Sequence, residues 1–335
     1  MQLSIIVPNV SNNTDLKNVL STYKYQDNQD FELILSLTNP GKIMYGTIEK
    51  YLDFFGSRLK FIVNNKRTSV QAEILSAFHL VKGKYSYIFF PDNAGRYYFV
   101  SRMIELTHKY DTEIIEFRPR LVNSIRWKPN PRVTQDTIFK IEKYPEVVAY
   151  SYPFIFNKIF KSTLLHKFDR LKIKEFNDSK FCIFLTYILL TNACSYAYYG
   201  ERIVRENISS NLWLAPNSFI SQFDILLENL KTSNTKLQYE VQYAKYYFLQ
   251  IFLAGLLKTW RKGFSVFNYF KNRSNFLERR SKKYADDLYK YLQRQQNNDS
   301  LFFDTNIYVN KNTFESKLIK TLTDIEKWDN ALEKM

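Results

Sequence analysis

Cysteine is nearly absent from this chain of 335 residues, which contains only Cys182 and Cys194. So few cysteines exclude a disulfide framework or a cysteine-rich zinc site, and they are typical of a protein of the reducing cytoplasm. The first residues of the chain already form a predicted strand. We therefore expect no signal peptide.

Long apolar runs are scarce as well. Residues 181–199 carry no charge, but Thr186, Thr191, Asn192 and Ser195 interrupt the stretch. A membrane-spanning helix needs about 20 predominantly apolar residues. We therefore expect a buried helix that runs into a buried strand, rather than a membrane span.

Acidic residues are the scarcer charge, with 33 Asp and Glu against 48 Lys and Arg, so the net charge is +15. Such a surplus favours polyanionic partners, which include nucleic acid, sugar nucleotides and anionic lipid head groups. The apolar fraction of 45% is sufficient for a substantial core.

Short apolar runs and amphipathic segments alternate along the first two thirds of the chain. This alternation predicts an α/β fold with a mainly parallel sheet that helices flank. Residues 118–152 lack a clear period, and we expect an irregular excursion over the sheet there. The predicted strands are 3–8, 31–37, 59–63, 85–90, 113–117 and 195–204, and the predicted helices are 14–23, 46–55, 69–81, 99–110, 155–165 and 179–194.

Proline does not occur after Pro216, and glycine is rare there. The pattern beyond this point predicts an α-helical C-terminal region. We place the domains at 1–212 and 213–335.

Much of the positive charge lies in 258–294, with eleven basic and three acidic residues. Basic and aromatic residues on a helix suit an anionic membrane surface. The same pattern fits a helix that packs its aromatic side chains on the sheet domain, so both interpretations stay open. Nucleic acid would be a third partner, but no recognised motif supports it and we expect none.

Two predicted strands end in polar turns. The run Leu3-Ser4-Ile5-Ile6-Val7-Pro8 leads into Asn9 and Val10, and the strand at 85–90 leads into Pro91-Asp92-Asn93. Ligands of open α/β sheets bind outside the carboxyl ends of the strands. The order and wording of these segments resemble the family 2 glycosyltransferases of the GT-A fold, in which such a loop lies beside the nucleotide base. The resemblance gives Pro8, Asn9 and Val10 that place.

The second strand keeps the family's frame but not its two aspartates, because Thr38 and Asn39 stand at its end. These residues can still hydrogen-bond a nucleotide, without the charge-assisted bond of a carboxylate. The family's Asp-x-Asp turn, which binds a divalent cation, is reduced to Asp92 and Asn93. One carboxylate can hold Mg²⁺ or Mn²⁺ when a diphosphate supplies further ligands, but the same residues also form an ordinary turn.

Further matches lie between residues 156 and 209. Phe156-Asn157-Lys158-Ile159-Phe160 resembles a stretch that precedes the family's catalytic helix, and Asp178 matches the aspartate that acts as general base there. Asp178 can equally cap the helix that begins at Ser179. Arg202 and Arg205 match a segment whose guanidinium groups can reach a diphosphate, or they belong to a basic edge strand.

The resemblance implies an inverting glycosyltransferase that moves a sugar from a nucleotide sugar, most simply a UDP-sugar, to a hydroxyl of a glycan, glycolipid or glycoprotein of the cell envelope. We expect it in the cytoplasm, with a peripheral membrane contact through 258–294. One alternative is a catalytically degenerate relative that serves as scaffold or partner of an active glycosyltransferase or of a second copy. Another is a binder of anionic membranes or nucleic acid.

Overall fold

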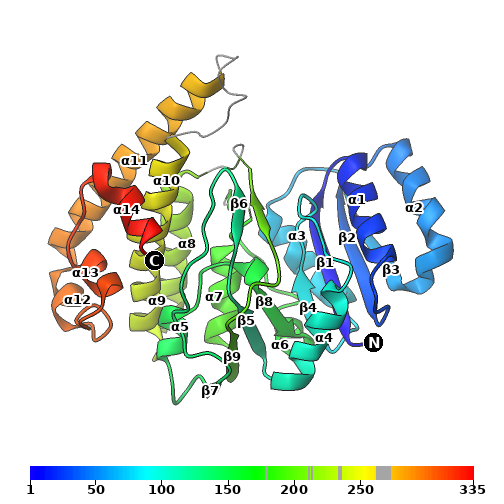
Figure 1. Cartoon of the computed structure of the whole chain (residues 1–335), viewed down its shortest axis with the longest axis horizontal. Coiled ribbons are helices and arrows are strands. Elements are labelled where there is room, and N and C mark those ends of the chain that lie inside the picture. The colour runs from blue at the N-terminus through cyan, green and yellow to red at the C-terminus, as the bar shows by residue number, and fades with distance from the viewer. Residues whose placement is uncertain (178–179, 210–211, 213, 233–235, 262–272) are drawn as a thin grey trace. The chain divides into compact units, whose positions relative to one another are not determined.

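The computed structural model describes the chain except for residues 178–179, 210–211, 213, 233–235 and 262–272 (Figure 1). The side chains of residues 260–261, 273–279 and 330 are also left out of the description below. The predicted basic and aromatic segment 258–294 therefore falls partly outside the described residues, and its membrane contact stays a prediction.

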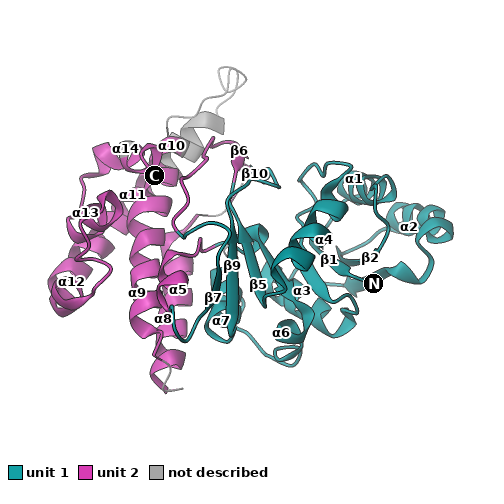
Figure 2. Ribbon diagram, turned by 60° about the horizontal axis from the view of Figure 1, so that its bottom comes forward, with its two compact units in different colours: residues 1–119, 133–144, 154–207 teal, residues 120–132, 145–153, 208–335 magenta. Residues whose placement is uncertain are grey.

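The chain forms two compact units, and both are discontinuous in sequence (Figure 2). Unit 1 contains residues 1–119, 133–144 and 154–207, and unit 2 contains residues 120–132, 145–153 and 208–335. Unit 2 thus combines the C-terminal region with two segments from the stretch that we expected to be irregular. The domain limits 1–212 and 213–335 stay a prediction.

Unit 1 is built on an eight-stranded sheet with the order β3-β2-β1-β4-β8-β5-β9-β7. Strand β1 pairs in parallel with β2 and β4, β2 with β3, and β5 with β9, whereas β8 and β7 run antiparallel to their neighbours. The predicted α/β sheet is confirmed. Its strands are β1 (Leu3–Val10), β2 (Phe31–Thr38), β3 (Leu59–Asn64), β4 (Tyr85–Ile88), β5 (Ile114–Phe117), β7 (Ile138–Lys140), β8 (Lys158–Lys161) and β9 (Ser195–Tyr199).

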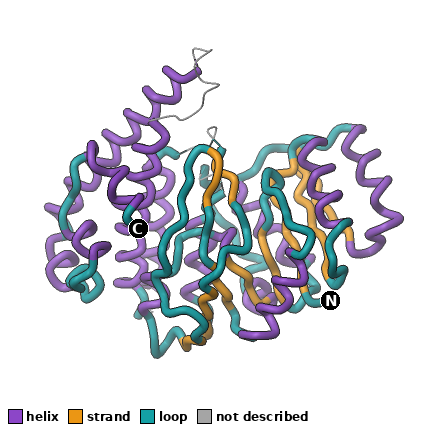
Figure 3. The backbone as a smooth tube through the Cα atoms, in the orientation of Figure 1, coloured by secondary structure: helices purple, strands orange, loops and turns teal. Residues whose placement is uncertain are grey.

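The helices of unit 1 follow the strands in turn, as the tube in Figure 3 shows. Side-chain caps begin two of them, since Asn12 accepts from the Asp15 N–H and Ser69 from the Ala72 N–H. These helices are α1 (Asn13–Lys24), α2 (Lys42–Phe55), α3 (Val70–Ala77), α4 (Phe99–Tyr110), α6 (Ser162–His166) and α7 (Ile183–Thr191), with 3₁₀ turns at Gly56–Arg58, Phe78–Leu80 and Ile155–Asn157.

Alternate residues of the strands form one core with α1, α2 and α4. Leu3, Ile5 and Val7 of β1 all belong to this core, as expected for side chains of period two on one face of a sheet. Tyr23 of α1 packs edge-on against Phe89, with ring centroids 5.3 Å apart. The apolar runs of the sequence therefore place both the sheet and the helices that cover this face.

Strand β8 corrects one expectation. We predicted a helix over 155–165, but residues 158–161 form a strand between β4 and β5. The fully buried Lys158 pairs with the equally buried Glu116 of β5 at 3.0 Å. It also donates to the carbonyl oxygen of Phe154. Pairing with distant strands thus overrides the local helical pattern.

The uncharged stretch 181–199 contains α7 and then β9, as predicted. Among the described residues, no helix is both long enough and apolar enough to span a membrane.

Unit 2 is mainly helical, which confirms the expectation for the described part of the C-terminal region. A π-helical segment, Tyr247–Leu253, connects two of its helices without a break. The elements are β6 (Leu121–Asn123), α5 (Glu146–Tyr150), α8 (Pro216–Thr232), α9 (Gln238–Tyr246), α10 (Ala254–Arg261), α11 (Arg273–Asn298), α12 (Ser300–Thr305), α13 (Phe314–Lys320), a 3₁₀ turn at Ile325–Lys327 and α14 (Trp328–Glu333), and β10 (Glu206–Ile208) leads into the unit.

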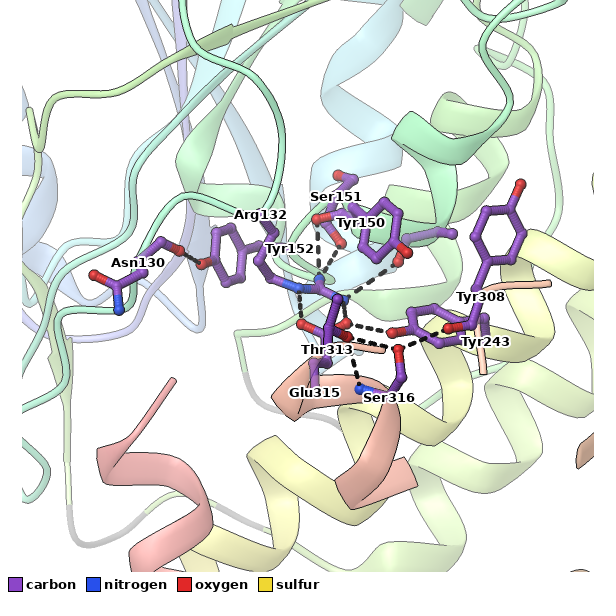
Figure 4. A network of polar contacts seen from close by, with 11 residues as sticks. Asn130, Arg132, Tyr150, Ser151, Tyr152, Tyr243, Tyr308, Thr313, Glu315 and Ser316 are labelled. Carbon is purple, nitrogen blue, oxygen red and sulfur yellow. Dashed lines mark hydrogen bonds and ion pairs between the residues drawn. The ribbon is translucent and has the colours of Figure 1, made fainter. Parts of the chain in front are cut away.

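A buried ion pair lies within unit 2 (Figure 4). Arg132 Nε lies 2.8 Å from Glu315 Oε2, and a terminal nitrogen lies 2.6 Å from Glu315 Oε1. The guanidinium also donates to the carbonyl oxygen of Tyr150 at 3.0 Å and lies over the ring of Tyr247. The Tyr243 hydroxyl donates to Glu315 at 2.7 Å. These contacts hold an early segment of the chain to α13.

Candidate functional site

The carboxyl ends of β1, β2 and β4 meet at one edge of the sheet, because the three strands are parallel neighbours. The pairing of β1 with β2 is irregular between Val7 and Val10. Pro8 lies in this irregular part, where its missing N–H disrupts the pairing least. Pro8 and Val10 are buried, whereas Asn9 is partly exposed. The loops that the sequence assigned to a nucleotide therefore share one edge.

Glu73 of α3 fixes the ends of β1 and β2. Its side chain is 1% exposed, and its Oε2 accepts from the backbone N–H of Asn9 at 2.5 Å. Its Oε1 accepts from the hydroxyl of Thr38 at 3.0 Å. A carboxylate in the first turn of a helix is also stabilised by the helix dipole. We did not predict this carboxylate. It binds the ends of β1 and β2 at the edge where we expected the residues of the strand ends to contact a ligand.

Thr38 and Asn39 are therefore placed differently from each other. The hydroxyl of Thr38 already donates to Glu73, and the residue is 6% exposed. Asn39 is exposed and has a positive φ of 49°, which asparagine tolerates better than most residues. Asn9 has a similar φ of 57°. Of the two residues at the end of β2, Asn39 is the one whose side chain remains accessible to a ligand.

A buried lysine that we did not predict contacts the turn after β4. The ammonium of Lys180 lies 2.9 and 3.1 Å from the two carboxylate oxygens of Asp92 and 2.6 Å from Glu206 Oε1. It also donates to the carbonyl oxygen of Asn207 at 2.7 Å. The side chains of Lys180 and Glu206 are 6% and 1% exposed, whereas that of Asp92 is 33% exposed. Asp92 is thus the accessible member of a cluster with one ammonium and two carboxylates.

The charge of Lys180 survives its burial. Burial lowers the pKa of Lys180, but Glu206 and Asp92 raise it by more, so its pKa lies above the ordinary value. The lysine is therefore an ammonium at neutral pH, as a buried charge with two carboxylate partners should be.

Asn93 holds the segment after β9 to this turn. Its side chain is 7% exposed, and its amide donates to Glu206 Oε2 at 2.8 Å. Its carbonyl oxygen accepts from the backbone N–H of Asn207 at 2.9 Å. Asn93 thus positions Glu206 and Asn207 beside Asp92.

These contacts bear on whether a divalent cation fits at Asp92 and Asn93. Both oxygens of Asp92 accept from Lys180, and Oδ2 also lies 3.2 Å from the amide of Asn207. An Mg²⁺ or Mn²⁺ ion needs free oxygen ligands, and at Asp92 it would lie against an ammonium. As arranged, these residues do not fit a divalent cation. Among the described residues, no group of three or more His, Cys, Asp and Glu side chains could hold a metal ion.

The two arginines lie in the connection from β9 to β10. Arg205 is exposed and directly precedes Glu206, which bonds Asn93. Arg202 is partly exposed and lies closer to the end of β9. The end of β9 lies at the same edge of the sheet as those of β1 and β4, because β9 runs parallel to β5 and two antiparallel pairings through β8 connect β5 to β4. Asp178, the predicted base, lies outside the described residues.

Sequence reasoning missed Glu73, Lys180 and Glu206. A weak signal existed for two of them. Glu73 is a lone acid among apolar positions of a short predicted helix, and Glu206 directly follows an arginine that we had selected. Nothing in the sequence pairs Lys180 with Asp92, because 88 positions separate them.

No protein-family model matches this chain, and no curated protein matches it. Solved structures do match. The structure of residues 1–349 of TarS from S. aureus in complex with UDP-GlcNAc has a TM-score of 0.60 and 11% identity, over 89% of this chain and 92% of that chain.

The chain has a GT-A-like fold. The same TarS segment in complex with UDP gives a TM-score of 0.58 at 14% identity, again over 89% and 92% of the two chains. A longer TarS structure gives 0.54 at 16% identity, over 87% of this chain and 49% of that chain. The fold inferred from the strand endings is thereby confirmed.

Proposed function

We propose that this chain is a glycosyltransferase, which moves a sugar from a nucleotide-sugar donor to an acceptor hydroxyl. The observation that carries the proposal is the polar edge of the sheet, where Asn9, Asn39 and Asp92 end parallel strands. This is where ligands bind in open α/β sheets. The likeness to TarS, whose structure was solved with UDP-GlcNAc and with UDP, supports a UDP-sugar as donor.

The nucleoside would lie against Pro8, Asn9 and Val10, with Thr38 and Asn39 beside it. Asn39 would supply side-chain hydrogen bonds, because the Thr38 hydroxyl already binds Glu73. Arg202 and Arg205 would contact the diphosphate, to which guanidinium groups bind well. The acceptor would be a glycan, a glycolipid or a glycoprotein of the cell envelope.

Asp178 would act as the general base. The acceptor oxygen would attack the anomeric carbon, the bond from that carbon to the diphosphate oxygen would break, and the hydroxyl proton would pass to Asp178. One in-line displacement inverts the anomeric configuration. This role depends on the sequence match of Asp178 alone.

The test is the release of nucleoside diphosphate from a panel of nucleotide sugars by the wild type, Asp178→Asn and Asp169→Asn. Asp169 is an exposed aspartate of the preceding segment and serves as the matched control. We expect slow release from one donor, a fall of about 100-fold or more in Asp178→Asn, as for loss of a general base, and no change in Asp169→Asn. Equal rates in all three proteins would remove Asp178 from the mechanism.

A second candidate is a catalytically degenerate relative that acts as a scaffold or partner subunit. The contact of Lys180 with both oxygens of Asp92 favours this candidate. Asp92 is the one carboxylate that remains of the family's Asp-x-Asp turn, and the lysine already occupies it. Binding of UDP without turnover of any donor, with a panel of glycan and lipid acceptors present, would support this candidate. Turnover would exclude it.

A further inference from the structure

The ammonium of Lys180 has the surroundings of a bound cation. Its hydrogen bonds go to oxygen atoms of Asp92, Glu206 and the carbonyl of Asn207, at 2.6 to 3.1 Å, and it also lies 4.9 Å from the centroid of the Phe90 ring. The side chain is 6% exposed. Two carboxylates and a backbone carbonyl are also the ligands that hard divalent cations prefer. The lysine thus uses an oxygen set that could otherwise attract such an ion.

We propose that Lys180 is the resident cation of this site, so that the chain takes its anionic ligand without a divalent metal. The part of this inference that concerns the donor rests on the proposed function. The part that concerns the cation rests only on the contacts of Lys180 with Asp92 and Glu206.

The position of Lys180 explains why this one side chain both neutralises the carboxylates and excludes a divalent ion. A divalent ion at Asp92 would meet the fixed positive charge of Lys180 at close range, in surroundings that screen it poorly. The ion could enter only if the ammonium left Glu206, whose carboxylate is 1% exposed. An unpaired buried carboxylate is strongly unfavourable. The cluster therefore keeps its lysine and rejects the metal.

The neighbouring residues complete the arrangement for an anion. Asn93 donates to Glu206 and accepts from the backbone N–H of Asn207, and the side-chain amide of Asn207 lies 3.2 Å from Asp92 Oδ2. Arg205 is exposed next to Glu206 and adds a second positive charge at this edge. A diphosphate would therefore meet the guanidinium of Arg205 over a cluster whose carboxylates Lys180 already compensates in part.

The decisive experiment uses Mn²⁺ alone. Free Mn²⁺ is measured by its paramagnetic resonance signal during titration of the wild type, Lys180→Ala, and the double variant Lys180→Ala with Asp92→Asn. We expect no saturable site in the wild type. Lys180→Ala should gain a saturable Mn²⁺ site, at least about tenfold tighter than the residual binding by the wild type, because two carboxylates lose their cation. The double variant should lose that site again.

Lys245→Ala is the matched control. Lys245 is also a buried lysine of high pKa, but it pairs with the single, half-exposed carboxylate of Asp224. Its removal should create no Mn²⁺ site. Binding by Lys245→Ala equal to that of Lys180→Ala would show that any vacated lysine suffices and would overturn the assignment.

Two results would refute the proposal directly. One is a saturable Mn²⁺ site in the wild type that Asp92→Asn abolishes. The other is a folded Lys180→Ala protein that binds no Mn²⁺. If Lys180→Ala does not fold, UDP binding by the wild type decides: equal affinity with EDTA and with Mn²⁺ supports the inference, and tighter binding with Mn²⁺ that needs Asp92 contradicts it. If UDP does not bind, the proposed function fails, whereas the Mn²⁺ titration of the wild type still judges the lysine.

Discussion

Replacement of Glu315 by Gln tests the buried ion pair of unit 2. The change keeps the shape of the side chain and removes its charge, so the guanidinium of Arg132 loses its counter-ion. The two side chains are 4% and 10% exposed, for Arg132 and Glu315 respectively. Removal of one partner of a buried pair costs about 3 to 5 kcal/mol, because the remaining charge stays away from water without compensation.

The surroundings place the expected loss at the lower end of this range. Arg132 keeps the carbonyl oxygen of Tyr150 at 3.0 Å and the ring of Tyr247. We therefore expect the free energy of unfolding to fall by about 3 kcal/mol. With a urea m-value of about 2 kcal/mol per molar, the unfolding midpoint falls by about 1.5 M.

Tryptophan fluorescence is the appropriate assay, because the four tryptophans of the chain, at 127, 213, 260 and 328, all belong to unit 2 by sequence. Its urea transition therefore reports on unit 2. The matched control is Asp324→Asn, which breaks the exposed pair with Lys327, whose side chains are 69% and 70% exposed. Such a pair contributes at most about 1 kcal/mol.

A loss in Glu315→Gln no larger than that in Asp324→Asn would refute the reasoning. A further variant separates charge from packing. Arg132→Met combined with Glu315→Leu removes both charges, and replacement of a whole buried pair by apolar residues is often nearly neutral. The double variant should therefore be more stable than Glu315→Gln, and an equal or larger loss would mean that shape, not charge, holds the segment.

Four further substitutions have expected outcomes. Gly83→Ala should destabilise the fold by about 1 to 3 kcal/mol, because the new Cβ would lie 2.7 Å from the backbone of β1. Gly46→Ala, in α2, has open space around the new Cβ and should stabilise the fold by about 0.5 to 1 kcal/mol. Thermal unfolding of both variants checks the opposite signs. Burial raises the pKa of Glu240 above its ordinary value of 4.5, so the folded state keeps this proton to a higher pH than the unfolded state, and the free energy of unfolding falls as the pH rises above 4.5. Between about pH 4 and pH 7 the urea midpoint should therefore fall less in Glu240→Gln than in the wild type. An equal pH dependence in the two proteins would contradict this. Glu73→Gln replaces an acceptor oxygen by an N–H donor, which would face the N–H of Asn9 or the hydroxyl of Thr38. The free energy of unfolding should therefore fall by about 1 to 3 kcal/mol, and urea titration measures this against the exposed Glu49→Gln.

Much of the sheet could be predicted, because its signals are local. The buried runs at 3–8 and 31–37 read as strands from their apolar content; Asn39 directly follows β2, whereas β1 continues past Pro8 to Val10. The edge at which these strands end follows from their parallel pairing. The fold class was therefore accessible from the sequence.

The site was less accessible, because its contacts join distant positions. Lys180 reaches Asp92 across 88 positions, and Lys158 is buried in β8 only because Glu116 lies on the adjacent strand. A lysine in a polar segment gives no sign that it will be buried between acids. The predicted roles of Asp178, Arg202 and Arg205 remain predictions for the same reason, since they depend on where loops lie.

The discontinuity of unit 2 has a consequence for synthesis on the ribosome. Arg132 emerges 183 positions before its partner Glu315. The indole N–H of Trp127 donates to the carbonyl oxygen of Leu332, which is synthesised 205 positions later. Until the last helices are made, this early segment must remain hydrated or be shielded by a chaperone. A fragment that stops at residue 207 would therefore contain Trp127 and Arg132 without their partners in the last helices. An expression vector should encode the chain through α14.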